Sequence, residues 1–134
     1  MKKKLLIVWE NPYSLREAIV PIIPKLAEKF TVSLILSDYY STESIINSVK
    51  ELESNHFIEK YWIVPDSSKI LKHHFYIKSK LKLWKKCNFD ICMTGSSIQV
   101  LDRYLMSCVL SKHCIYVCFF YSPGYLLMHE DFVK

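Results

Sequence analysis

The sequence contains very little glycine, since Gly95 and Gly124 are the only two among its 134 residues. Nucleotide-binding loops of the G-x-G-x-x-G type and P-loops need closely spaced glycines, because the backbone must approach a phosphate at those positions. The two glycines here lie far apart in the chain. Both kinds of phosphate-binding loop are therefore excluded.

Arginine is equally scarce, with Arg16 and Arg103 as its only positions. All other basic residues are lysines, and the net charge is +5. Arginine is the preferred side chain for bidentate contacts to bases and phosphates, so we expect no nucleic acid partner. A lysine-rich surface suits a diffuse anionic partner such as the face of a membrane. The alternative is an ordinary solvated surface.

The cysteines and histidines show no pattern of a metal or redox centre. None of the 5 cysteines forms a C-x-x-C pair, and none of the 5 histidines has metal-ligand spacing with another histidine or a cysteine. We therefore expect no metal and no cofactor. No export signal is evident, and no apolar run is long enough to cross a bilayer. Free thiols without an export signal are typical of the cytoplasm, where we place the chain.

Short apolar runs alternate with helical patterns along the chain. Residues 5–9 (Leu-Leu-Ile-Val-Trp) form a continuous apolar run, which is typical of a strand covered on both faces. Further strands are predicted at 31–36, 61–64, 90–93 and 114–121. Helices are predicted at 14–30, 42–53, 68–86 and 98–110. Pro21 and Pro24 fall inside the first helix, so we expect it to kink or break near Val20.

The regular alternation of strand and helix favours right-handed βαβ units. We predict one Rossmann-like α/β domain over residues 1–124, in which a mostly parallel five-stranded sheet lies between two layers of helices. The expected strand order is 3-2-1-4-5, as in half of a doubly wound fold. Residues 125–134 show no clear period. We expect them to form an irregular tail or the start of a further segment.

A site is expected where the strand order reverses, because open parallel sheets bind ligands outside the carboxyl ends of their strands at that point. For the predicted order this point lies between the first and fourth strands. The predicted substrate-binding residues in the loops there are Glu10, Asn11, Gly95, Ser96 and Ser97. Gly95 permits a close approach to the backbone, and the serines at a helix N-terminus offer donors to an anion or a sugar hydroxyl.

Glu10 is the candidate catalytic residue, as a general base at the end of a buried strand. The alternative is that Glu10 is an exposed loop acid, that Gly95 serves only the turn, and that a serine merely caps the next helix. Asp38 and Asp66 end the second and third strands and are predicted to be turn or capping residues.

The helix at 68–86 is unusually rich in lysine. Its apolar residues Ile70, Ile77, Leu81 and Trp84 fall on one face and are expected to pack on the sheet. The predicted membrane-surface residues, roughly opposite, are Lys69, Lys72, Tyr76, Lys80 and Leu83. Apolar groups among lysines suit the inner face of an anionic membrane. The alternative is a solvated helix whose lysine stems cover the apolar side chains.

Several segments share the layout of one known group of proteins. They are Lys3–Trp9 as the opening strand, Ser14–Phe30 as the first helix, Thr31–Leu36 as the second strand, and Phe89–Ser96 as the fourth strand and its loop. In this arrangement the chain resembles the N-terminal, acceptor-side domain of GT-B glycosyltransferases and the related nucleotide-sugar epimerases. The resemblance covers most of residues 3–124 and lies in the layout, without a diagnostic catalytic motif.

The resemblance implies a role in polysaccharide biosynthesis, in which this domain binds a glycan or a lipid-linked glycan as acceptor. A second domain or a partner subunit would then bind the nucleotide sugar. The glycine-rich loop that often follows the first strand in that family is replaced here by Glu10-Asn11-Pro12. We therefore expect no transferase activity from this chain alone. The alternative is a non-catalytic, flavodoxin-like binding or interaction module.

Overall fold

The computed structural model describes residues 1–9, 15–38, 43–66, 68–94 and 114–118. These residues form one sheet of five parallel strands in the order β3-β2-β1-β4-β5. The predicted strand order and strand direction are therefore confirmed. The strands are β1 (Lys3–Trp9), β2 (Phe30–Ser37), β3 (Lys60–Val64), β4 (Ile91–Thr94) and β5 (Ile115–Cys118). The predicted helix at 98–110 and the tail at 125–134 lie outside the described residues.

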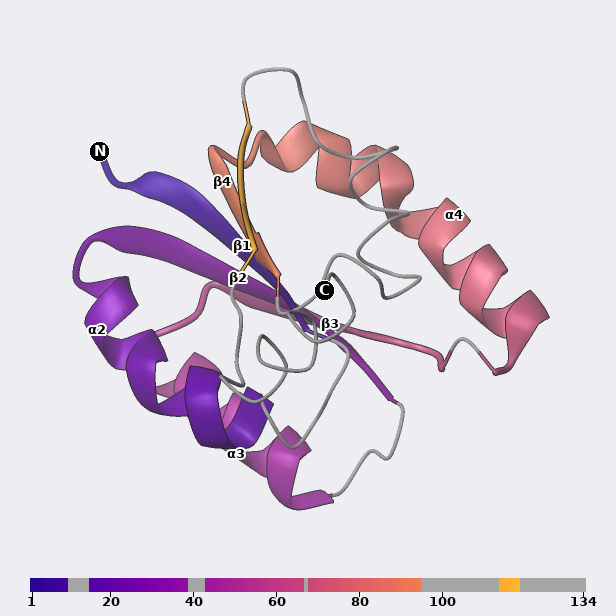
Figure 1. The fold of residues 1–134 in the computed structure, drawn as a ribbon, viewed down its shortest axis with the longest axis horizontal. Coiled ribbons are helices and arrows are strands. Elements are labelled where there is room, and N and C mark those ends of the chain that lie inside the picture. Colours follow the sequence, from indigo (N-terminus) through magenta and orange to yellow (C-terminus); the bar gives the residue numbers. More distant parts are fainter. Residues whose placement is uncertain (10–14, 39–42, 67, 95–113, 119–134) are drawn as a thin grey trace, which may run out of the picture.

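Helical segments lie on both faces of the sheet. They are η1 (Leu15–Ile19), η2 (Val20–Ile22) and α2 (Ile23–Ala27) between β1 and β2, α3 (Glu43–Ser54) before β3, and α4 (Ile70–Cys87) before β4. Figure 1 shows α2 and α3 on one side of the sheet and α4 on the other. The chain therefore has the three-layer, Rossmann-like α/β architecture that the sequence predicts.

The predicted break in the first helix is confirmed at Val20. A π-helical turn ends at Ile19, a single 3-10 turn follows, and a short α-helix begins at Ile23. Pro21 and Pro24 each lie in one of the first two positions of a new segment. A backbone N–H has no helical partner at those positions, so the prolines leave no hydrogen bond unmade there.

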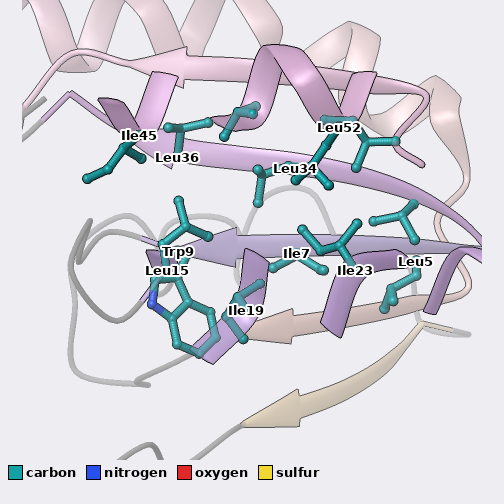
Figure 2. Close-up of a cluster of buried hydrophobic side chains, with 13 residues drawn as sticks. Leu5, Ile7, Trp9, Leu15, Ile19, Ile23, Leu34, Leu36, Ile45 and Leu52 are labelled. Atoms are coloured by element: carbon teal, nitrogen blue, oxygen red, sulfur yellow. The ribbon is translucent and has the colours of Figure 1, made fainter. Parts of the chain in front are cut away.

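The core beneath α2 and α3 is built from the alternate side chains of β1 and β2. Figure 2 shows Ile7 of β1 pointing toward Ile19 and Ile23, while Leu34 of β2 points toward Leu52 of α3. Ile7, Ile19, Ile23 and Leu34 are fully buried. The continuous apolar run of β1 is explained by this packing together with the second core on the opposite face.

The core beneath α4 uses the side chains of β1 and β3 that point the other way. Leu6 and Trp62 pack with Ile77 and Trp84 of α4. The ring centroids of Trp62 and Trp84 are 6.0 Å apart, in an edge-to-face arrangement. The predicted packing of Ile77 and Trp84 on the sheet is thus confirmed, and Leu81 packs at the margin of the same core.

The predicted packing of Ile70 on the sheet is wrong. Its side chain is 73% exposed, although it shares the helical phase of Ile77 and Trp84. Figure 1 shows that the first turns of α4 extend beyond the ends of the strands. No sheet therefore lies beneath Ile70, and its phase on the helix does not bury it.

The end of α3 is a Schellman motif with an unusual residue at its centre. The His56 amide donates to the Glu53 carbonyl at 3.0 Å, and the Phe57 amide donates to the Leu52 carbonyl at 2.9 Å. His56 takes a left-handed conformation with φ of 62°. Glycine is usual at this position, because a Cβ atom there costs roughly 1 kcal/mol.

Replacing His56 with glycine is expected to stabilise the domain by about 0.5–1 kcal/mol. Relief of the left-handed strain outweighs the extra freedom that glycine gives the unfolded chain. The midpoint of thermal unfolding, followed by circular dichroism, should rise by roughly 2–5 °C. His56→Ala keeps the Cβ atom and is the control, so its midpoint should not rise. An equal rise in both variants would contradict this account of strain.

Candidate functional site

The strand order reverses between β1 and β4, which lie side by side at the centre of the sheet. Val8 of β1 pairs with Thr94 of β4, so the two strands end at the same level. All predicted cleft residues follow these ends in the sequence and lie outside the described residues: Glu10, Asn11, Gly95, Ser96 and Ser97. The described strands thus give the position of the reversal point, while the crevice and its lining stay predictions.

A hydrogen bond between two hydroxyl groups holds the described end of β4 against β5. The Thr94 Oγ1 and Tyr116 Oη atoms lie 2.9 Å apart in a hydrogen bond that links β4 to β5. Thr94 is 1% exposed. Because this hydroxyl is buried and already paired, Thr94 positions the end of β4 and is not itself a ligand-binding group.

The ends of β2 and β3 are joined by aspartate hydrogen bonds. Asp38 accepts the Asp66 amide at 3.0 Å, and Asp66 accepts the Ser68 amide at 3.3 Å. Both aspartates are therefore the turn residues that the sequence predicts. Asp66 does not cap α4, because α4 starts from Lys69, which makes no side-chain cap hydrogen bond.

A buried histidine near the same edge was not predicted. His73 is 8% exposed, and its Nδ1 atom lies 2.7 Å from the Pro65 carbonyl oxygen. A carbonyl can only accept, so Nδ1 donates, and in the neutral ring Nε2 is the acceptor. Within the described part of the chain, Nε2 has no hydrogen-bond partner. The burial was readable from the sequence, because His73 precedes Ile77 by one helical turn on the packed face.

The predicted membrane-surface residues of α4 differ in their exposure to solvent. Lys69 and Lys72 are exposed, and Leu83 is 39% exposed. Tyr76 is half-buried against the core beneath α4, and the Lys80 Nζ atom lies 5.7 Å from the centroid of its ring. Burial raises the pKa of the Tyr76 hydroxyl. The ring of Tyr76 is therefore not the exposed apolar group that we expected.

The exposed apolar surface of α4 lies nearer its start. Ile70, Leu71 and Phe75 are 73%, 71% and 62% exposed, and we call these three residues the apolar tip. Leu71 and Phe75 were not predicted to be surface residues. The signal for them was available, since neither residue shares the helical phase of Ile77 and Trp84.

The thiol of Cys114 is held in its protonated form. Burial raises the pKa of Cys114, and the negative charge of Asp90 raises it further. Asp90 is fixed by β1, because its carboxylate accepts the Lys4 amide at 2.8 Å and its own amide donates to the Lys4 carbonyl at 2.9 Å. A thiol of this kind is a poor nucleophile, so the geometry gives no support to a redox role.

Replacing Asp90 with asparagine is expected to speed the alkylation of Cys114 by iodoacetamide severalfold at pH 8. The substitution removes the nearby negative charge, lowers the pKa of the thiol and increases the thiolate fraction. Mass spectrometry of the Cys114 peptide measures the rate, and Cys87 in the same molecule is the internal control. Equal acceleration of both cysteines would show a general loosening of the fold instead.

Metal binding and membrane crossing find no support in the described ranges. No group of three or more histidine, cysteine or acidic side chains there is arranged to hold a metal ion. No helix among these residues is both long and apolar enough to cross a membrane. Cys87, Cys92 and Cys114 form no disulfide bond within the described part of the chain.

Comparison with known proteins finds a similar fold and gives no function. No family model matches the sequence, and no curated protein matches it. The structure is similar to the crystal structure of a hypothetical protein from Sulfolobus tokodaii, with a TM-score of 0.53 and 12% sequence identity. The match covers 89% of this chain and 97% of that one. At this identity the similarity shows a shared Rossmann-like fold alone.

Proposed function

We propose that this chain is the acceptor-binding half of a GT-B-like glycosyltransferase, and that a glycan or lipid-linked glycan binds between the ends of β1 and β4. The observation that carries the proposal is the central pairing of β1 with β4. Because of this pairing, Trp9 and Thr94 lie close together at the carboxyl ends of the strands. The two predicted cleft loops start from these residues. Open α/β sheets bind their ligands at this position.

The nucleotide sugar would be bound by a second domain or a partner subunit. The chain has too few glycines for either common phosphate-binding loop. Ser96 and Ser97 are suited to sugar hydroxyls, and Glu10 follows β1 as the candidate base. On this proposal Glu10 acts only when the donor-binding partner is present.

A non-catalytic binding module is the second candidate, and the described rim favours it. Asp38 and Asp66 are engaged in turn hydrogen bonds, and His73 is buried on the inner face of α4. None of these three groups is presented to a ligand as an acid or base. On this hypothesis the same crevice holds a ligand without turnover.

An NMR titration of the ¹⁵N-labelled chain tests the proposal, with maltose, cellobiose and chitobiose as acceptor probes and UDP-glucose as donor probe. A disaccharide should shift the amide signals of Trp9 and Thr94 at concentrations where UDP-glucose does not. Substituting both Ser96 and Ser97 with alanine should weaken that binding about tenfold. Ser48→Ala is the matched control, because the Ser48 hydroxyl donates to the Ser44 carbonyl within α3, away from the ends of β1 and β4.

The outcomes of this titration separate the candidates. Binding of UDP-glucose alone, or shifts that avoid the ends of β1 and β4, would contradict an acceptor site. Disaccharide binding that survives the serine substitutions would place the ligand elsewhere. Glycosyl transfer on addition of the protein encoded next to this chain would favour the half-enzyme, and binding without transfer would favour the module.

We further propose that α4 holds the domain against an anionic membrane, where a lipid-linked acceptor would be found. The apolar tip offers three exposed side chains at one end of the helix. Behind it on the outer face lie Lys78, Lys82 and Lys86, all exposed, which we call the lysine row. The helix contains no aspartate or glutamate. With the apolar tip at one end of α4 and the lysine row behind it, the tip can insert among the lipid tails while the lysines contact the anionic headgroups.

A further inference from the structure

The amino-terminal edge of the sheet holds a cavity of about 510 Å³. The cavity lies where β2 begins, between the end of α2 and the turn from α3 to β3. Its size falls in the range of small-molecule sites, about 300–1,000 Å³. The predicted crevice between β1 and β4 belongs to the opposite, carboxyl edge of the sheet. The cavity is therefore separate from the site of the proposed function, and the inference below does not rest on that function.

The floor of the cavity is apolar and partly aromatic. Phe30 and Phe57 contribute half-buried rings, and Val32 and Ile58 contribute buried aliphatic side chains. The Glu59 amide donates to the Val32 carbonyl at 2.8 Å, which fixes the entry to β3 against β2. An apolar ligand body thus finds a preformed surface.

The rim of the cavity is negatively charged. Glu53 lines it from the last turn of α3 and Glu59 from the residue before β3, and both side chains are exposed. The single lysine in the lining, Lys2, donates its Nζ hydrogen to the Ala27 carbonyl at 2.7 Å. This hydrogen bond holds the Lys2 ammonium at the cavity wall, where it keeps its positive charge, so the lining carries two negative charges and one positive charge. Among the described residues, Glu53 and Glu59 make no ion pair with a lysine or arginine. Their carboxylates are therefore available to a ligand.

His56 adds an observation that is independent of the charges. It lines the cavity from the left-handed position of the Schellman motif, where glycine would be less strained. Strained non-glycine residues gather at ligand sites, where the side chain has a use that offsets the strain. His56 thus lines the same cavity as Glu53 and Glu59.

We infer that this cavity binds a small organic amine with an aromatic or aliphatic body. The body would lie on Phe30 and Phe57, and the ammonium group would be held by Glu53 and Glu59. The His56 ring would accept a further N–H from the same ammonium group. A neutral or anionic molecule with the same body would lack these charge-assisted hydrogen bonds.

Phenethylamine is a suitable probe of the whole chain, with phenethyl alcohol and phenylacetate as neutral and anionic probes of similar body. In titrations followed by ¹⁵N NMR, phenethylamine should shift the amides of Phe57, Ile58 and Glu59. It should also bind at least about tenfold more tightly than either control, as expected for charge-assisted contacts. Substituting Glu53 and Glu59 with glutamine should remove that advantage.

Glu51→Gln is the matched control variant, because Glu51 is an exposed glutamate of α3 that does not line the cavity. It should leave the affinity unchanged, and His56→Gly should weaken binding severalfold while the protein stays folded. Equal affinity for the three probes would overturn the inference, as would binding that is insensitive to Glu53 and Glu59. Absence of shifts at the cavity on addition of phenethylamine would overturn it too.

Discussion

Replacing Trp84 with alanine is expected to destabilise the domain by about 3–5 kcal/mol, which is most of the stability of a typical small domain. Trp84 is 1% exposed and makes the edge-to-face contact with Trp62 that ties α4 to β3. Loss of this ring leaves a large void under the only helix that covers this face among the described residues. Guanidinium unfolding followed by circular dichroism measures the loss.

Trp84→Phe provides a sharper comparison. Within the described part of the chain, the buried Trp84 Nε1 atom has no hydrogen-bond partner. An unmade buried hydrogen bond costs about 1–3 kcal/mol, so removal of this donor offsets the lost volume. The phenylalanine variant should stay within about 1 kcal/mol of the parent protein. If it is as unstable as the alanine variant, the indole nitrogen is satisfied in solution.

The exposed Leu83 is the control for this pair of substitutions. It lies one residue before Trp84 on the same helix and is 39% exposed. Leu83→Ala should cost less than about 1 kcal/mol, since surface substitutions have small effects. A large loss at Leu83 would mean that an unseen partner covers the outer face of α4.

Reversing the charge of the lysine row is expected to abolish binding to anionic vesicles. A basic residue near such a surface contributes about 1 kcal/mol, so removal of Lys78, Lys82 and Lys86 alone predicts a loss of about 100-fold. Substitution of all three with glutamate adds repulsion to this loss. Co-sedimentation with vesicles of phosphatidylglycerol and phosphatidylcholine measures it, and vesicles of phosphatidylcholine alone should pellet little protein.

The matched control reverses three exposed lysines away from α4. Lys29, Lys50 and Lys60 lie on or near α2, α3 and β3, and their replacement gives the same change in net charge. This control should bind vesicles far better than the lysine-row variant. Phe75→Ser should weaken binding roughly tenfold or more, because an inserted ring contributes about 1.5–3 kcal/mol. Equal loss in both charge variants would mean that net charge alone matters.

The fold could be predicted from the sequence because local and global signals agree. The continuous apolar run of Leu5–Trp9 marks a strand that is covered on both faces, and it proves to be the central β1. The break at Val20 follows from Pro21 and Pro24, whose chemistry acts within one helical turn. The strand order is one of the common doubly wound orders that right-handed βαβ units permit, and the structure has this order.

The features that were missed depend on where elements end relative to each other. Ile70 has the right helical phase to be buried and is exposed, because α4 begins beyond the sheet. The cavity at the amino edge is formed by α2, β2 and the α3–β3 turn together, and no sequence motif predicts that these three elements lie side by side.

The candidate site was predicted only as far as topology determines it. The reversal point between the first and fourth strands follows from strand order, and the pairing of Val8 with Thr94 confirms that position. The roles of Glu10, Asn11, Gly95, Ser96 and Ser97 depend on side-chain geometry in loops outside the described residues. They stay predictions of the glycosyltransferase proposal.

The most direct test of this account is a set of interstrand NOE measurements on the ¹⁵N,¹³C-labelled chain. β1 lies between β2 and β4 with all three strands parallel, so Leu6 should show backbone contacts to both Ser33 and Cys92. These contacts should join amide and Hα protons in the parallel pattern. Close Hα–Hα contacts between β1 and β4, or contacts from β1 to β3, would remove the crevice on which the proposed acceptor site depends.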